Sequence, residues 1–269
     1  MGNIFNLNRF GFLVKRQWLD FGKVYLLTLI ILVAVIFSFY CYFIPSPIEN
    51  DNFDHDGNLD MRFRYGLFLL LGFLFISITS SSYFNILGQK PRAIQELMLP
   101  ASTFEKFAGA LFYTAILSVI SYLLIFYCID LGFVKYLNGH LNEFKMESVK
   151  QPRIKEVESI FKQVATDRNY LMYVSNFFPF PFLVMSIFLL GSVYFNRFHY
   201  IKTAISVVIF GYVTFYIIFK ASTLFIGDKV LKNVTVQKEA ILLWIFLVSA
   251  AITLTLWLIT YIRLKEKEV

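Results

Sequence analysis

The sequence predicts an all-α, polytopic membrane protein with six transmembrane helices. The hydrophobic fraction is 58% and the charged fraction only 16%. Long apolar segments carry no Asp, Glu, Lys, Arg or His in their interiors, and each approaches or exceeds the roughly 20 residues that cross a bilayer. Backbone amides cannot face lipid unpaired, so runs of this kind are helices. We place the six spans at residues 24–44, 65–87, 107–129, 173–195, 203–219 and 241–262.

Residues 1–23, before the first span, have an amphipathic pattern. Apolar side chains recur at spacings of three and four, with basic and polar residues between them. This pattern predicts a helix lying in the headgroup plane. The alternative is a basic tail that only sets the topology. The apolar positions are Leu7, Phe10, Val14, Trp18 and Phe21.

The distribution of basic residues predicts that both termini lie in the cytoplasm. Lys and Arg are more frequent in the segments on the side of the amino terminus than in the short segments on the other side. The net charge of +7 is therefore explained by topology and by contact with lipid headgroups, and we expect no nucleic-acid partner.

The second span carries a cluster of small polar residues. Because these residues occupy more than half of the helix circumference, we expect them to meet other helices rather than lipid. They could line a substrate pathway or form a seam between subunits, or their hydroxyls could bond only to their own helix. The fourth span contains Asn176 and then Pro179 and Pro181, which predict a bend or break. The cluster comprises Ser77, Thr79, Ser80, Ser81, Ser82 and Asn85.

The connector at residues 88–106 predicts a short cytoplasmic helix followed by the start of the third span. Pro91 suits the first helical position, and Pro100 ends the helix. Ser102 and Glu105 then form an S-x-x-E capping box. The short helix has an apolar face of Ile94, Leu97 and Met98 and a polar face of Arg92, Gln95 and Glu96.

Residues 131–169 are predicted to form a long extracytoplasmic loop. Val157, Ile160, Phe161 and Val164 have helical spacing, which predicts a short amphipathic helix at the outer surface. It could cap the exit of a pathway or bind a partner.

The first extracytoplasmic connector has oxygen-bearing side chains at alternate positions, as in a calcium-binding loop. Asn at the first position and Phe63 at the twelfth depart from that pattern, so a solvated acidic turn is the simpler interpretation. Elsewhere we expect no metal site. The candidate ligands are Asn52, Asp54, Asp56, Asn58 and Asp60.

No catalytic motif is present in the sequence. It lacks G-x-x-x-x-G-K-[ST], H-E-x-x-H, G-x-S-x-G and C-x-x-C, and its three His are widely separated. Ion-coupled transporters usually place an ionisable residue inside the bilayer, and these span interiors have none. We therefore expect that the chain is not an enzyme and that any energy for transport comes from another protein.

The order of these elements, together with one motif, resembles a type-2 ABC exporter permease subunit of the small bacterial six-span kind. The motif runs from Gln89-Lys90-Pro91-Arg92-Ala93 through Leu97-Met98-Leu99-Pro100-Ala101-Ser102-Thr103-Phe104-Glu105-Lys106. In proteins of that class the first helix is an elbow at the membrane surface, and the connector between the second and third spans is a coupling helix. The resemblance implies that Arg92, Gln95, Glu96, Leu97 and Met98 contact a separate ATP-binding subunit.

The resemblance also implies the location, partners and cofactors. The protein would be a multi-pass protein of the bacterial cytoplasmic (inner) membrane, paired with a second permease copy or a related subunit. ATP and magnesium would bind the ATP-binding cassette subunit and not this chain. The long loop at 131–169 and the short connector between the fifth and sixth spans depart from the usual pattern. The alternative function is a non-transporting sensor or immunity protein that recognises a peptide or protein through its extracytoplasmic loop.

Overall fold

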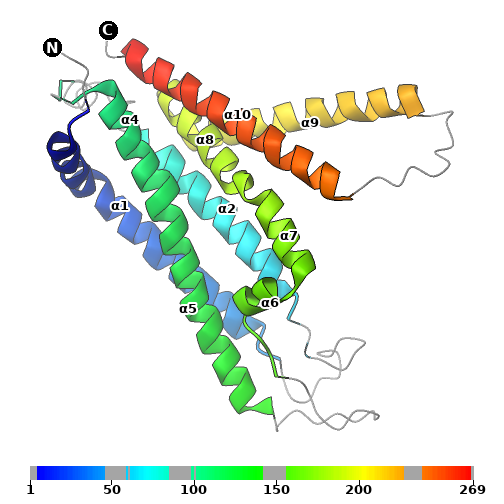
Figure 1. Cartoon of the computed structure of the whole chain (residues 1–269). Helices are drawn as coiled ribbons and strands as arrows, with labels where there is room; N and C mark the ends of the chain where they lie inside the picture. The colour runs from blue at the N-terminus through cyan, green and yellow to red at the C-terminus, as the bar shows by residue number, and fades with distance from the viewer. Residues whose placement is uncertain are drawn as a thin grey trace. The chain divides into compact units, whose positions relative to one another are not determined.

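A computed structural model describes residues 5–45, 59, 61–84, 98–99, 101–141, 156–226 and 238–267, and its regular elements are helices (Figure 1). Among these residues, six helices are long and apolar enough to cross a membrane. The predicted helical fold with six candidate spans is thus confirmed. The six candidates are Leu7–Tyr42, Phe63–Tyr83, Thr103–Gly139, Tyr170–Tyr194, His199–Ile217 and Ala240–Lys267.

The first span is longer than predicted because it includes the amphipathic stretch. Helix α1 (Leu7–Tyr42) has 36 residues and is about 54 Å long at 1.5 Å per residue. A separate interfacial helix ending near Lys23 is therefore absent from this part of the chain. The local sequence explains the continuity, since no proline interrupts it and the indole of Trp18 covers Gly22 from the preceding turn.

The third span also extends beyond its predicted end. It consists of α4 (Thr103–Leu111), a π-helical turn η3 (Phe112–Leu117) and α5 (Ser118–Gly139). The first residues of the predicted loop 131–169 are therefore helical, because Phe133, Val134 and Leu137 supply a buried face that continues the helix. The same predicted loop contains α6 (Ile160–Thr166), where the amphipathic pattern lies, and the first residues of α7 (Arg168–Phe177).

The predicted interruption of the fourth span is confirmed. Helix α7 ends at Phe177, and α8 (Pro179–Tyr194) begins two residues later with Pro179 in its first turn. Proline has no amide hydrogen to donate to a carbonyl of the preceding turn, so α7 does not continue through it. Proline is well tolerated in the first turn of a helix, so α8 can begin there. The other long helices are α2 (Phe63–Tyr83), α9 (His199–Ile226) and α10 (Lys238–Lys267).

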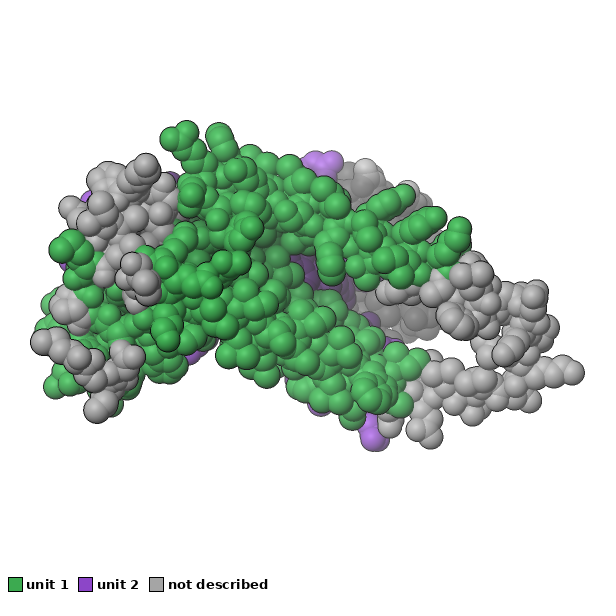
Figure 2. All heavy atoms as spheres, turned by 90° about the horizontal axis from the view of Figure 1, so that it is seen from above, with its two compact units in different colours: residues 1–16, 76–115, 176–269 green, residues 17–75, 116–175 purple. Residues whose placement is uncertain are grey.

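The chain divides into two compact units, coloured separately in Figure 2. Unit 1 comprises residues 1–16, 76–115 and 176–269, and unit 2 comprises residues 17–75 and 116–175. The boundaries fall inside α1, α2 and η3 and at the end of α7, so each of the first four spans contributes to both units.

Unit 1 is built around α8, which packs against α9 and α10, while α10 also packs against α4. Close approach of α8 and α9 depends on Gly191, since a Cβ there would lie 1.9 Å from Oγ1 of Thr203. The rings of Phe107 and Tyr261 join α4 to α10, with centroids 5.8 Å apart. Met185 and Leu189 of α8 are among the most deeply buried side chains.

Unit 2 has an aromatic core between α1, α2 and α5. The hydroxyl of Tyr122 on α5 donates to the carbonyl of Phe68 on α2 over 2.5 Å, and its ring lies against Gly72. The hydroxyl of Tyr25 on α1 donates to the carbonyl of Leu117 at the end of η3 over 3.2 Å. These buried hydroxyls satisfy their hydrogen bonds within the helix pairs that they join.

Candidate functional site

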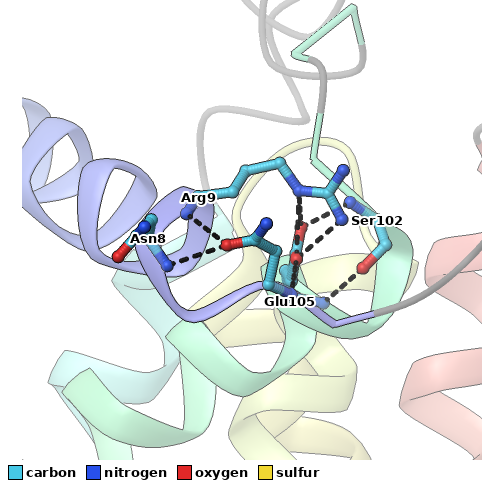
Figure 3. A network of polar contacts seen from close by, with 5 residues as sticks. Asn8, Arg9, Ser102 and Glu105 are labelled. Carbon is cyan, nitrogen blue, oxygen red and sulfur yellow. Dashed lines mark hydrogen bonds and ion pairs between the residues drawn. The ribbon is translucent and has the colours of Figure 1, made fainter.

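The predicted capping box at the start of the third span is present in unit 1 and belongs to a larger polar network (Figure 3). The amide of Glu105 donates to Oγ of Ser102 over 3.2 Å, and the amide of Ser102 donates to Oε2 of Glu105 over 2.9 Å. These reciprocal bonds satisfy two amides that a helix start otherwise leaves unpaired. They also fix the direction in which residues 101–102 enter α4.

The same carboxylate binds the start of α1. Nε of Arg9 lies 2.8 Å from Oε2 of Glu105, and Nη2 of Arg9 lies 2.7 Å from Oε1. The amide of Asn6 donates to Oε1 over 3.0 Å, while the side-chain oxygen of Asn6 caps α1 by accepting from the amide of Asn8. One carboxylate therefore organises the beginnings of two helices that are 96 residues apart in the sequence.

The environment of Glu105 makes this attachment strong. Its side chain is 0% exposed, whereas Arg9 is 38% exposed. A buried carboxylate is costly unless it is paired and hydrogen-bonded, and here donors come from two segments. A second bond reinforces the contact, since the hydroxyl of Tyr113 donates to the carbonyl of Val14 over 2.7 Å. We call this set of contacts, which joins the start of α1 to α4 and η3, the Glu105 junction.

Most of the predicted coupling residues lie outside the described residues, namely Arg92, Gln95, Glu96 and Leu97. Met98 is described, and its side chain is 79% exposed, four residues before Ser102. The calcium-loop candidates Asn52, Asp54, Asp56, Asn58 and Asp60 also lie outside the described residues. Within the described ranges, no group of three or more His, Cys, Asp or Glu is arranged to hold a metal ion.

The polar cluster of the second span is largely buried. Ser77, Thr79 and Ser81 are buried, and the hydroxyl of Thr79 donates to the carbonyl of Ile76 in its own helix. Ser80 bonds to the same carbonyl. Ser77 also makes a contact outside its helix, because its Oγ lies 3.4 Å from the hydroxyl of Tyr200 on α9. Both predicted behaviours, bonding to the own helix and contact with another helix, thus occur.

The other residues of the predicted pathway or subunit seam are less buried or are not described. Ser82 and Asn176 are half-buried, and Asn85 lies outside the described residues. The structure therefore brings part of the cluster into the packed interior of unit 1, where it serves helix packing. A substrate pathway through these residues stays a prediction.

Sequence reasoning missed a buried ion pair in unit 2. Nη1 of Arg64, in the first turn of α2, lies 3.0 Å from Oδ1 of Asp130 on α5, and the two side chains are 1% and 0% exposed. Asp130 also accepts from the hydroxyl of Tyr40 over 2.9 Å and from the amide of Ile160 over 3.0 Å. Nη2 of Arg64 donates to the carbonyl of Glu158 over 3.2 Å.

This ion pair holds the segment before α6 against α2 and α5. The side chain of Asn138 on α5 adds two bonds to the backbone of Val157, at 3.0 Å and 2.9 Å. Aromatic rings surround the pair, since the ring of Tyr40 packs against those of Phe126 and Phe133. Both charges lie just outside the predicted spans, so the sequence shows two polar span ends and gives no signal that they meet.

No protein-family model, curated protein or solved structure matches this chain. The functional argument therefore rests on the residues and on their geometry.

Proposed function

We propose that the protein is the transmembrane permease subunit of an ABC-type exporter, in which a separate ATP-binding cassette subunit hydrolyses ATP. The proposal places the chain in the bacterial cytoplasmic membrane, with both termini and the segment at residues 88–106 in the cytoplasm. ATP and magnesium bind the partner subunit. The substrate moves through a path formed by this chain and a second permease copy.

The Glu105 junction is the observation that carries the proposal. A coupling segment works only if its movement reaches the spans, and the segment at 88–101 leads directly into Ser102 and Glu105. Glu105 binds both the cap of α4 and the start of α1. A displacement of this connector is therefore passed to two spans at once, because neither helix start can move without breaking bonds to the same buried carboxylate.

Two further features support the partner assignments. Met98 exposes an unbranched apolar side chain at the end of the proposed coupling helix, and such side chains adapt well to a partner surface. Helix α9 exposes nearly all of its apolar side chains in the described part of the chain, with only 6% of its most apolar window buried. Lipid covers such a surface in a monomer, and a second permease copy covers part of it in the proposed dimer.

Charge reversal in the coupling segment tests the proposal. Arg92→Glu combined with Glu96→Arg is expected to lower the amount of ATP-binding subunit that co-purifies by about tenfold or more, as for the loss of one or two charged contacts at an interface. The measurement is quantitative mass spectrometry of the complex purified in mild detergent, normalised to this chain.

Lys265→Glu is the matched control, since Lys265 is an exposed basic residue near the end of α10. It reverses a charge on the same proposed side of the membrane and is expected to leave recovery unchanged. Full recovery of the ATP-binding subunit with the Arg92, Glu96 double variant would contradict the proposed coupling site.

A further inference from the structure

The turn that joins α8 to α9 in unit 1 has an unusual backbone conformation. Phe198 has a φ of 55°, which places it in the left-handed region. Glycine and asparagine enter this region readily, whereas a phenylalanine there is strained. Its side chain is 72% exposed, so packing within unit 1 does not explain why a large ring stands at this position. Strained residues cluster at functional sites, and the exposed ring therefore indicates a role outside the packed interior.

The bonds around Phe198 hold the turn in this shape. The amide of Lys202 donates to the carbonyl of Phe198 over 3.0 Å. The hydroxyl of Thr203 donates to the carbonyl of His199 over 2.7 Å, and both of these side chains are buried. The inner side of the turn is therefore fixed to the interior of unit 1, and its outer side presents the exposed side chains from a preformed backbone.

The turn lies where two candidate spans reach a membrane surface. The span Tyr170–Tyr194 ends just before it, and the span His199–Ile217 begins directly after Phe198. Phe198, Ile201 and Ile205 have helical spacing and are all exposed, so they form an apolar stripe that runs from the turn along α9. Apolar and aromatic side chains in such a position are buried at the boundary between headgroups and acyl chains. The turn itself then lies among the headgroups.

Two exposed basic residues flank Phe198, and we call residues 195–202 the basic turn. Arg197 precedes Phe198, and Lys202 lies one helical turn after it on the same face of α9. Arg197 has no ion pair or side-chain hydrogen bond within the described residues. The ammonium of Lys202 lies 5.7 Å from the ring centroid of Phe195. An ammonium has three hydrogens, so this ring contact leaves donors for a second group.

The acidic side chains that the structure describes in unit 1 are already paired with other cations. Glu105 binds Arg9 within the Glu105 junction, and Glu266 near the end of α10 pairs with Arg263 at 2.7 Å. Unit 1 therefore offers no described carboxylate to the two cations of the basic turn. Their charge is complementary to an anion from outside the chain.

We propose that the basic turn binds the headgroup of an anionic phospholipid, with the phosphate at Arg197 and Lys202 and the ring of Phe198 inserted beside it among the acyl chains. Guanidinium and ammonium groups form charge-assisted hydrogen bonds with phosphate oxygens. A zwitterionic lipid has an ammonium of its own that competes for its phosphate and repels these cations, whereas an anionic headgroup has none. The inference does not depend on the proposed transport function.

Native mass spectrometry of the full chain tests the proposal. The protein is delipidated in detergent and then incubated with phosphatidylglycerol, phosphatidylethanolamine or phosphatidylcholine. We expect preferential retention of phosphatidylglycerol, because it alone of the three has a net negative charge. Arg197→Gln with Lys202→Gln is expected to lower this retention by about tenfold or more, as for the loss of a charged hydrogen bond.

Phe198→Gly separates lipid binding from folding. Glycine adopts a positive φ without strain, so the unfolding temperature is expected to stay the same or to rise. Retention of phosphatidylglycerol is expected to fall by about tenfold, as for the loss of one buried aromatic side chain. A lower unfolding temperature with undiminished retention would assign Phe198 to the fold alone and overturn its proposed insertion.

A matched double variant controls for general effects of charge. Lys15→Gln with Arg16→Gln removes one lysine and one arginine from exposed positions on α1, and retention is expected to stay unchanged. Arg197 and Lys202 are exposed, so their substitution leaves the fold intact, which the unfolding temperature of the double variant verifies.

Several results would overturn the proposal. Equal retention of the three lipids, or undiminished retention of phosphatidylglycerol by the folded Arg197, Lys202 variant, excludes a specific headgroup site. An equal loss of retention in both double variants shows that binding follows net charge and not the basic turn. Binding of inorganic phosphate with the same dependence on the two cations, without retention of lipid, assigns the turn to a free anion.

Discussion

Asp130→Asn is expected to destabilise the protein by about 3–5 kcal/mol, the typical cost of removing one partner from a buried ion pair. The substitution leaves Arg64 charged and 1% exposed without the carboxylate that pairs with it. It also weakens the bonds from Tyr40 and from the amide of Ile160. The measurement is the free energy of unfolding in mixed micelles, compared with that of the unsubstituted chain.

An exposed ion pair provides the control for Asp130. Arg263 and Glu266 pair at 2.7 Å with side chains that are 49% and 54% exposed, so Glu266→Gln is expected to cost less than about 1 kcal/mol. Adding Arg64→Gln to Asp130→Asn removes the unpaired charge and is expected to recover part of the loss. An Asp130→Asn protein as stable as the unsubstituted chain would show that the pair is not buried as described.

Glu105→Gln is expected to loosen the starts of α1 and α4 together. The substitution removes the charge that binds Arg9 and weakens the acceptor for the amides of Asn6 and Ser102. We expect a loss of about 1.5–3 kcal/mol, the usual contribution of hydrogen bonds to a charged group. Hydrogen-deuterium exchange measured by mass spectrometry should become faster in residues 5–14 and 101–106 and stay unchanged in unit 2.

Ser102→Ala distinguishes the cap from the junction. It removes only the side-chain acceptor for the amide of Glu105 and is expected to cost about 1 kcal/mol. Exchange should then rise at the start of α4 and stay unchanged at the start of α1. If Glu105→Gln accelerates exchange in residues 101–106 alone, the carboxylate does not hold α1, and the mechanical link that supports the proposed coupling is absent.

Much of the fold follows from local sequence. The apolar runs identify the cores of all six candidate spans, and Pro179 marks the break between α7 and α8. The capping box of Ser102 and Glu105 is also a local pattern, in which two side chains three residues apart satisfy each other's amides. Signals of this kind need no knowledge of the tertiary structure, which is why the sequence alone contains them.

The helix ends and the polar networks depend on distant partners. Hydropathy ends the third span at Ile129 because Asp130 is charged, yet Arg64 compensates that charge from 66 residues away and the helix continues. The role of Glu105 toward Arg9 is hidden for the same reason, although its capping role is visible. A single sequence does not record which distant charges meet.

The central claim is that an ATP-binding subunit works with this chain, and purification of the complex tests it most directly. The full chain is purified in mild detergent through a carboxyl-terminal tag, its partners are identified by mass spectrometry, and ATP hydrolysis by the sample is measured. Our account predicts that a protein with a P-loop co-purifies and that the sample hydrolyses ATP in the presence of magnesium. Recovery of this chain alone from several detergents, without ATP hydrolysis, would contradict the account.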